Sequence, residues 1–272
     1  MINEDNKKFS ELSSEFLNNS FFPHIIIDNF LEEKIAKEVN KELIQLSEDA
    51  KPFFSYNCKK YALDDIDKFS EQTKALVNFL NSQKFINELE KLTGLEGVIP
   101  DPELAGSGLH FSKKDGYLNI HVDFQSHIRN KTWARVINLL IYFNEGWTEK
   151  NNGNLDIWNA DFSESASVLP EMNRCVIFRT VKKSYHGHPN PLSPPENDMR
   201  KSILISYYVD TKKPLPLEET DFYPAPGDSF IKKKLIKIDQ LLLRIFSYIK
   251  RLGLVKDSNY TRVINYFLKN KY

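Results

Sequence analysis

The chain has little of what marks secreted, membrane-spanning or metal-knuckle proteins. Cys58 and Cys175 are its only cysteines in 272 residues, and two distant cysteines supply neither a disulfide framework nor a zinc knuckle. No apolar run approaches the roughly 20 residues that a membrane-spanning helix needs. The polar start, MINEDNKKFSELSSEF, has no apolar core of a signal peptide. We therefore expect a cytoplasmic protein without a transmembrane segment.

The chain also lacks net charge, since 37 Lys and Arg residues balance 37 Asp and Glu residues. A chain without an overall field is not drawn to nucleic acid by charge, so we expect no nucleic-acid partner. What is present is typical of a globular protein, with 41% hydrophobic and 27% charged residues. The length allows a sizeable core.

Three regions follow one another along the chain. Residues 1–20 form a polar N-terminal segment for which we expect partial order at best, residues 21–212 form the main domain, and residues 213–272 form a Pro-rich connector and a C-terminal helical extension. Apolar spacing in the main domain predicts a strand over 22–27, a helix over 31–46 and one broken helix or two over 71–92. Gly94 is the expected C-cap of the last of these.

From residue 104 the pattern changes to short β-branched runs separated by turns. They predict strands over 109–112, 117–124, 135–143, 155–158, 174–179 and 202–209. Lys113–Gly116 would form a hairpin or a strand-connecting turn. Helices followed by strands indicate an α+β or mainly β fold, in which a β-sandwich or open barrel packs on helices.

The C-terminal extension is predicted to be helical over 231–252, with a shorter helix over about 260–269. The first helix is basic and amphipathic. Such a helix can lie on anionic lipid, but more often it packs on its own domain. For residues 228–252 we favour packing, with peripheral membrane contact as the alternative.

Polar residues at strand spacing end the run over 117–124. His121 and Asp123 are two residues apart, so on a strand they face the same side. With a second histidine they would form the two-histidine, one-carboxylate face that binds non-haem Fe(II) and leaves other positions open. A core histidine beside a turn-forming acid is the plainer interpretation of the triplet alone. Its position before a later histidine and Arg200 favours the metal site.

The third ligand is His186 or His188, which flank Gly187. We favour His186, because it continues the direction of the preceding strand. His188 would then lie in a loop as a pocket residue.

A carboxylate-binding group is predicted one strand further on. Arg200 and Ser202 share a strand face, and a guanidinium pairs bidentately with a carboxylate while a hydroxyl adds a donor. Tyr142, which shares a face with Asn138, would complete this co-substrate site. A surface arginine and a core tyrosine are the alternatives. A dicarboxylate beside iron points to 2-oxoglutarate.

Residues 108–209 resemble the prolyl 4-hydroxylase-like branch of the 2-oxoglutarate/Fe(II) dioxygenase superfamily, especially bacterial members with an SYHGHP-type distal motif. The resemblance is carried by GLHFSKKDGYLNIHVDF, RVINLLIYFNEGW, NGNLDIW, NRCVIF, SYHGHPNPLSPP and RKSILISYYV. It implies a double-stranded β-helix (jelly-roll, cupin-like) core over about 104–210, with N-terminal supporting helices. It also implies that His121, Asp123 and His186 hold the iron, and that Arg200, assisted by Tyr142, binds the C5 carboxylate of 2-oxoglutarate.

The function implied by this resemblance is hydroxylation of an organic substrate with release of succinate and CO2. Fe(II), 2-oxoglutarate, O2 and ascorbate as reductant would be its cofactors, and a prolyl peptide, an amino acid or a saccharide-type small molecule its substrate. The carboxylate of Asp123 argues for hydroxylation rather than halogenation. The alternatives are a catalytically inactive jelly-roll binding protein and a partner- or membrane-docking protein that uses the basic helix.

Two positions depart from the family pattern. Asn152-Gly153 stands where many members have Gly-Gly, and Phe111 stands ten residues before His121, where a tyrosine often contacts the co-substrate. The second difference predicts that co-substrate contacts fall more heavily on Arg200, Ser202 and Tyr142.

Overall fold

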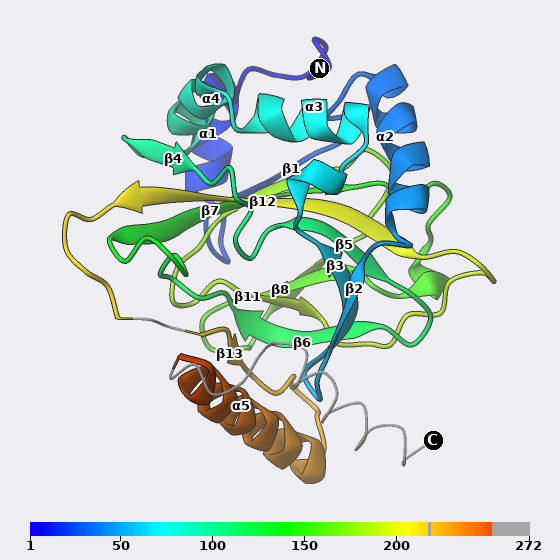
Figure 1. Ribbon diagram of the computed structural model, residues 1–272, viewed down its shortest axis with the longest axis vertical. Coiled ribbons are helices and arrows are strands. Elements are labelled where there is room, and N and C mark those ends of the chain that lie inside the picture. Colours follow the sequence, from blue (N-terminus) through cyan, green and yellow to red (C-terminus); the bar gives the residue numbers. More distant parts are fainter. Residues whose placement is uncertain (217–218, 252–272) are drawn as a thin grey trace.

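A computed structural model describes residues 1–216 and 219–251 of the chain. Four helices precede most of the strands and lie together on one side of the sheet (Figure 1). They are α1 (Phe9–Leu17), α2 (Glu33–Leu46), α3 (Glu71–Leu80) and α4 (Gln83–Thr93). The helix predicted over 31–46 is confirmed, and the region 71–92 forms two helices.

Local capping explains why the second of these two helices starts and ends where it does. The Ser82 hydroxyl accepts a hydrogen bond from the Phe85 N–H at the start of α4, as an N-cap serine does. Gly94 ends α4 with φ +67°, a left-handed conformation that glycine adopts without steric cost. The predicted C-cap is confirmed.

The N-terminal segment is more ordered than its polarity predicted. Residues Phe9, Leu12 and Phe16 of α1 are buried in the main core, and the Phe9 ring packs edge-on against Phe85 of α4 at 5.9 Å between centroids. Three apolar residues at helical spacing are sufficient to attach a short helix to the core. Residues 9–17 are thus the helical part of a segment for which partial order at best was expected.

The strands form one curled antiparallel sheet of 13 strands. Its first half runs β1 (His24–Ile27), β10 (Cys175–Arg179), β7 (Trp133–Tyr142), β12 (Arg200–Asp210) and β5 (Gly108–Ser112). Its second half runs β6 (Tyr117–Val122), β11 (Tyr185–His188), β8 (Leu155–Trp158) and β9 (Ser165–Val168). The two halves are joined by β3 (Cys58–Leu63), which pairs with both β5 and β6. This is the predicted double-stranded β-helix.

The remaining strands are short and pair at the margins of these two halves. They are β2 (Lys51–Phe54), β4 (Val98–Pro100) and β13 (Asp221–Phe222). The 3₁₀ turns η1 (Ile66–Lys68) and η2 (Glu149–Asn151) lie in connections. Sequence periodicity missed β4, β9, β11 and β13 because runs of two to four residues carry too little alternation to be recognised.

The Lys113–Gly116 segment connects strands that do not pair with each other. β5 pairs with β12 and β3, whereas β6 pairs with β11, β3 and β13. The segment is therefore a crossing from one half of the sheet to the other, and not a hairpin.

Two apolar layers follow from strand alternation. Helix residues and the outward faces of β7, β10 and β12 share the largest core cluster, which includes Leu139, Ile177 and Ile205. A smaller cluster, including Tyr142, Ile157 and Phe178, lies between the two halves of the sheet. The interior of the double-stranded β-helix is thus apolar on one side. Its other side carries buried polar residues.

The C-terminal extension adds β13 and α5 (Phe230–Arg251) at the end of the molecule opposite α1–α4 (Figure 1). Among the described residues, no helix is both long enough and apolar enough to cross a membrane. The helix predicted over 260–269 lies outside the described residues.

Candidate active site

Two histidines face each other across a pair of neighbouring strands. His121 of β6 is the register partner of His186 of β11, and their ring centroids are 4.3 Å apart. The Nδ1 atom of His121 lies 3.0 Å from the Asn119 carbonyl, and that of His186 lies 2.8 Å from the Ser184 carbonyl. Donation from Nδ1 to these carbonyls leaves both Nε2 lone pairs directed at the same point.

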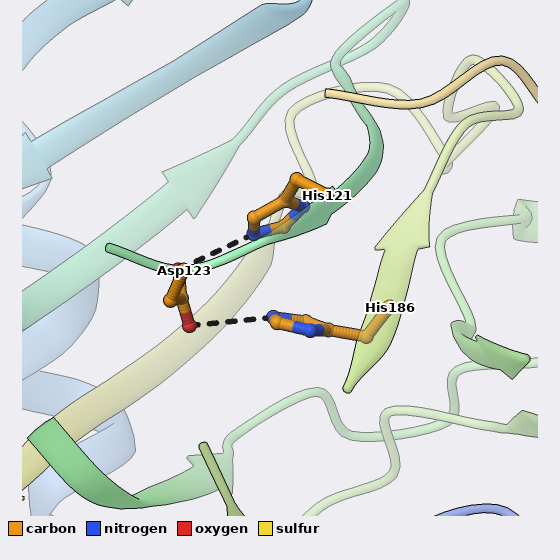
Figure 2. Close-up of side chains that lie close together, drawn as sticks. All are labelled: His121, Asp123 and His186. Atoms are coloured by element: carbon orange, nitrogen blue, oxygen red, sulfur yellow. Dashed lines mark ion pairs between the residues drawn. The ribbon is translucent and has the colours of Figure 1, made fainter. Parts of the chain in front are cut away.

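Asp123 follows β6 and completes the group. Its Oδ1 lies 3.5 Å from His121 Nε2, and its Oδ2 lies 3.5 Å from His186 Nε2 (Figure 2). One ligand atom from each of the three residues lies within 4.8 Å of the others. Two imidazole nitrogens and a carboxylate oxygen suit Fe(II), so the predicted set His121, Asp123 and His186 fits the metal.

The Asp123 carboxylate is held by residues of β7. The Asn138 amide donates to Oδ2 at 2.6 Å, and Arg135 Nη2 lies 3.7 Å from the same oxygen. Arg135 Nε in turn donates to Asn138 Oδ1 at 2.8 Å, and the Ser206 hydroxyl lies 3.2 Å from that atom. Asn138 thus lies at the iron end of the site, beside Asp123.

The charges of the site favour metal binding at neutral pH. Burial would raise the pKa of Asp123, but Arg135 and the two histidines hold that pKa well below its usual range. Burial, helped by His121, lowers the pKa of His186 to about 4. An ionised carboxylate and a neutral imidazole are the forms that bind iron.

Arg200 lies at the other end of the interior, almost fully buried. Its Nε donates to the Gly153 carbonyl at 2.7 Å and its Nη2 to the Tyr142 hydroxyl at 3.3 Å, while the guanidinium lies 4.8 Å from the Tyr142 ring centroid. Neither partner is charged, and no described carboxylate forms an ion pair with Arg200. A buried cation without an anion is costly, so this geometry is suited to an anionic ligand.

The residues around Arg200 support a carboxylate site. Ser202 pairs in register with Tyr142 across β12 and β7 and is buried. Burial raises the pKa of Tyr142, so its phenol stays protonated and able to donate. Gly153 has φ +83°, and a Cβ there would come within 3.2 Å of the Arg200 side chain. Glycine is therefore needed at the second position of Asn152-Gly153, where the sequence keeps it.

His110 and His188 are the interior residues that sequence reasoning underrated. His110 pairs in register with Ser202 and so shares its face, whereas Phe111 is buried in the helix-facing core. The interior position next to the co-substrate region is thus occupied by His110. The alternation of Leu109, His110 and Phe111 carried this signal, because the apolar neighbours of His110 both face the helices.

His188 is buried in β11, not in a loop, and it is not one of the three metal-ligand candidates. Its Nδ1 has no hydrogen-bond partner among the described residues. It lines a polar cavity of about 240 Å³ together with Gly153, Asp156 and Asn190. The structure therefore brings His186, and not His188, to His121 and Asp123.

The C-terminal extension reaches this site. Phe222 of β13 pairs in register with His121, and the two ring centroids are 5.7 Å apart. His127, in contrast, lies 3.2 Å from Asp101 and packs against Trp133 and Tyr208, so it belongs to the core.

Comparison with known families agrees with this geometry. Residues 107–208 match the family model described as the 2OG-Fe(II) oxygenase superfamily. The match includes the three metal-ligand candidates and Arg200. A comparison with curated proteins finds no match.

Several solved prolyl hydroxylases share the fold at low sequence identity. The Trichoplax adhaerens prolyl hydroxylase, solved with a hypoxia inducible factor peptide fragment, has a TM-score of 0.54 and 18% identity, covering 75% of this chain and 90% of that one. A Pseudomonas putida prolyl-4-hydroxylase has a TM-score of 0.53 and 14% identity, covering 75% and 100%. A Phytophthora capsici prolyl 4-hydroxylase has a TM-score of 0.52 and 17% identity, covering 78% and 69%.

The family match over residues 107–208 includes the histidine and aspartate group, so this region of the chain is similar to the 2-oxoglutarate/Fe(II) oxygenase superfamily, and the chain shares the fold of solved prolyl hydroxylases.

Proposed function

We propose that the protein is a dioxygenase that hydroxylates an organic substrate and converts 2-oxoglutarate to succinate and CO2. His121, Asp123 and His186 would hold Fe(II), and Arg200 with Tyr142 and Ser202 would bind the far carboxylate of 2-oxoglutarate. Iron held there would supply oxygen activation. The single observation that carries the proposal is the placement of the metal-ligand group and an unpaired buried arginine in one interior.

The protein's own residues would fix geometry and exclude water. Asn138 and Arg135 orient the Asp123 carboxylate, and the carbonyls of Asn119 and Ser184 orient the two imidazoles. Such outer contacts raise ligand basicity and fix the ring tautomer. We therefore assign Asn138 a positioning role. It would hold the Asp123 carboxylate on the iron side of the co-substrate.

We propose a prolyl peptide, an amino acid or a saccharide-type small molecule as the substrate. The Trichoplax relative was solved with a peptide fragment, which supports the first class. The polar lining of the cavity beside His188, with Glu149, Asn154 and Asp156, supports a hydrogen-bonding ligand of the other two classes.

The first experiment measures succinate release by anaerobically reconstituted protein given Fe(II), 2-oxoglutarate and then O2. Wild type is expected to release succinate even without substrate, and His121→Ala is expected to release none. Arg200→Ala is measured in the same assay. Its control is Arg129→Ala, because Arg129 lies on the surface with an exposed side chain.

A wild-type protein that binds neither Fe(II) nor 2-oxoglutarate would overturn the proposal. An inactive jelly-roll binding protein would then be the better interpretation. Binding of both without any succinate release would contradict the catalytic part alone.

A further inference from the structure

The C-terminal helix α5 is attached to the domain through its polar side. Asp239 accepts hydrogen bonds from the backbone N–H groups of Tyr56 and Asn57, each at 3.2 Å, and from the Asn57 amide at 2.8 Å. The Asn57 amide also donates to the Ile236 carbonyl at 3.1 Å. Ile236, Asp239 and Gln240 are buried. The attachment therefore includes a buried carboxylate that several donors of the domain satisfy.

The same helix is tied to β13, next to the iron site. Lys237 Nζ donates to the Phe222 carbonyl at 2.8 Å, and Gln240 and Arg244 both contact the Asp221 carboxylate. These contacts use the flank of α5 and fix its rotation about its own axis. The orientation of its outer face is thus determined by several independent bonds.

The outer face of α5 is apolar and exposed. Six large apolar residues of this helix are between 47% and 70% exposed: Phe230, Ile231, Ile238, Leu241, Leu242 and Ile245. At about 100° per residue they fall within an arc of about 120°, opposite Ile236 and Asp239. An amphipathic helix ordinarily turns its apolar stripe towards the core. In α5 the apolar stripe points away from the domain. We call this stripe the outer face of α5.

The charges beside the outer face that form no ion pair are positive. Among the residues of α5 whose side chains the structure describes, five are basic and a single one, Asp239, is acidic and buried. Asp228 and Asp221 pair with Lys232 and Arg244 at its edges. Lys233 and Lys234 form no ion pair with any described residue, and Lys234 lies over the Phe230 ring at 4.5 Å.

We propose that the outer face of α5 is a docking surface for an anionic lipid bilayer, which it contacts while lying parallel to the membrane plane. Apolar side chains would enter the boundary between headgroups and acyl chains, and Lys233 and Lys234 would meet lipid phosphates. The charge of the face selects this occupant. A second copy of the helix would bring the same cations together, whereas an anionic surface neutralises them.

Vesicle sedimentation with the full chain tests the proposal. Binding is expected to vesicles of phosphatidylcholine with phosphatidylserine, to weaken at high salt, and to be much weaker with phosphatidylcholine alone. Leu241→Asp with Ile245→Asp should reduce binding by about tenfold or more, and so should Lys233→Glu with Lys234→Glu. Ile44→Asp is the matched control, because Ile44 is a comparably exposed apolar residue on α2. Thermal unfolding of each variant shows that the fold is retained.

A site-specific fluorescent probe gives a second, independent reading. Cys58 and Cys175 are fully buried, and burial raises the pKa of the Cys58 thiol to about 11. A polarity-sensitive dye therefore labels Leu241→Cys or Ile44→Cys selectively. Phosphatidylserine vesicles should shift the emission of the Leu241→Cys probe to the blue and leave the Ile44→Cys probe unchanged.

Three results would overturn the proposal. The first is the absence of sedimentation with either vesicle. The second is a dimer in solution that Leu241→Asp dissociates, which would make the outer face an interface between copies. The third is a monomer whose probe at Leu241→Cys is already blue-shifted without vesicles, which would mean that another part of the chain covers the face.

Discussion

The interior of the double-stranded β-helix and the helix α5 reverse the usual distribution of polar and apolar groups in opposite ways. The interior buries three imidazoles and two guanidinium groups, and the Asp123 carboxylate beside them is only 13% exposed. In α5, a buried carboxylate faces the domain and six large apolar residues face outwards. Buried polar groups and contiguous exposed apolar surface are both unfavourable unless something compensates for them.

The compensation differs between the two regions. In the interior, part of it comes from the chain itself, since Asn138, Arg135 and backbone carbonyls satisfy the metal-ligand candidates. The remainder, at Arg200, would come from a bound carboxylate. In α5 the described residues satisfy only the buried side, and the outer face would be covered by lipid. The unpaired cation of Arg200 thus points to a bound carboxylate in the interior, and the exposed apolar face of α5 points to lipid.

The largest expected effect is a difference in Fe(II) affinity between variants of the two buried histidines of β11. His186→Ala should lower Fe(II) affinity by more than about 100-fold, beyond the range of outer-contact changes, because it removes a ligand atom. His188→Ala should leave Fe(II) binding nearly intact, because its ring is not part of the group around Asp123. Anaerobic Fe(II) titration measures both, and equal losses would contradict the assignment.

A second prediction separates function from stability at Arg200. Arg200→Met should raise the KM for 2-oxoglutarate by about 100-fold, since truncating one partner of a buried charge pair costs about 2–5 kcal/mol. In the absence of co-substrate, the same change should leave the free energy of unfolding unchanged or raise it by about 1 kcal/mol, because a buried cation without an anion is removed. Succinate kinetics and urea unfolding report the two effects.

Arg129→Met serves as the control for both measurements. A large loss of stability in Arg200→Met without any change in KM would show that Arg200 is structural and that the interior is not built for an anionic ligand.

The smallest expected effect concerns the attachment of α5. Asp239→Ala leaves the Tyr56 and Asn57 donors without their acceptor and should destabilise the docked helix by about 1–3 kcal/mol. Amide hydrogen exchange should become faster in α5 and stay unchanged in β7 and β12, because the helix is attached locally. Lys234→Ala, on the outer side of the same helix, is the control. Equal exchange in both variants would show that Asp239 does not hold the helix.

Much of the site was predictable from the sequence because strand geometry is local. Residues two apart on a strand share a face whatever the rest of the fold does, so the pairing of His121 with Asp123 and of Arg200 with Ser202 followed from spacing. Long apolar runs such as 135–143 likewise identified the central strands. The helical character of 71–92 was predicted for the same reason, whereas its division into two helices was left open.

Other features depended on residues that are distant in sequence. The bend of the sheet placed His186 opposite His121 and gave His188 a different neighbour, Leu118, through a register shift. Pairing of β5 with β12 directs the His110 side chain into the interior and the Phe111 side chain towards the helices. The backbone N–H groups that donate to the Asp239 carboxylate belong to residues 56 and 57, more than 180 positions away in the sequence.

The amphipathic character of residues 231–252 was evident from the sequence, but amphipathicity has no direction until a partner surface is present. Spacing alone determined which residues share a face, because backbone periodicity is a local property. The tertiary structure decided which face meets the core and which meets the surroundings, because that choice depends on hydrogen-bond partners and charges brought together only by the fold.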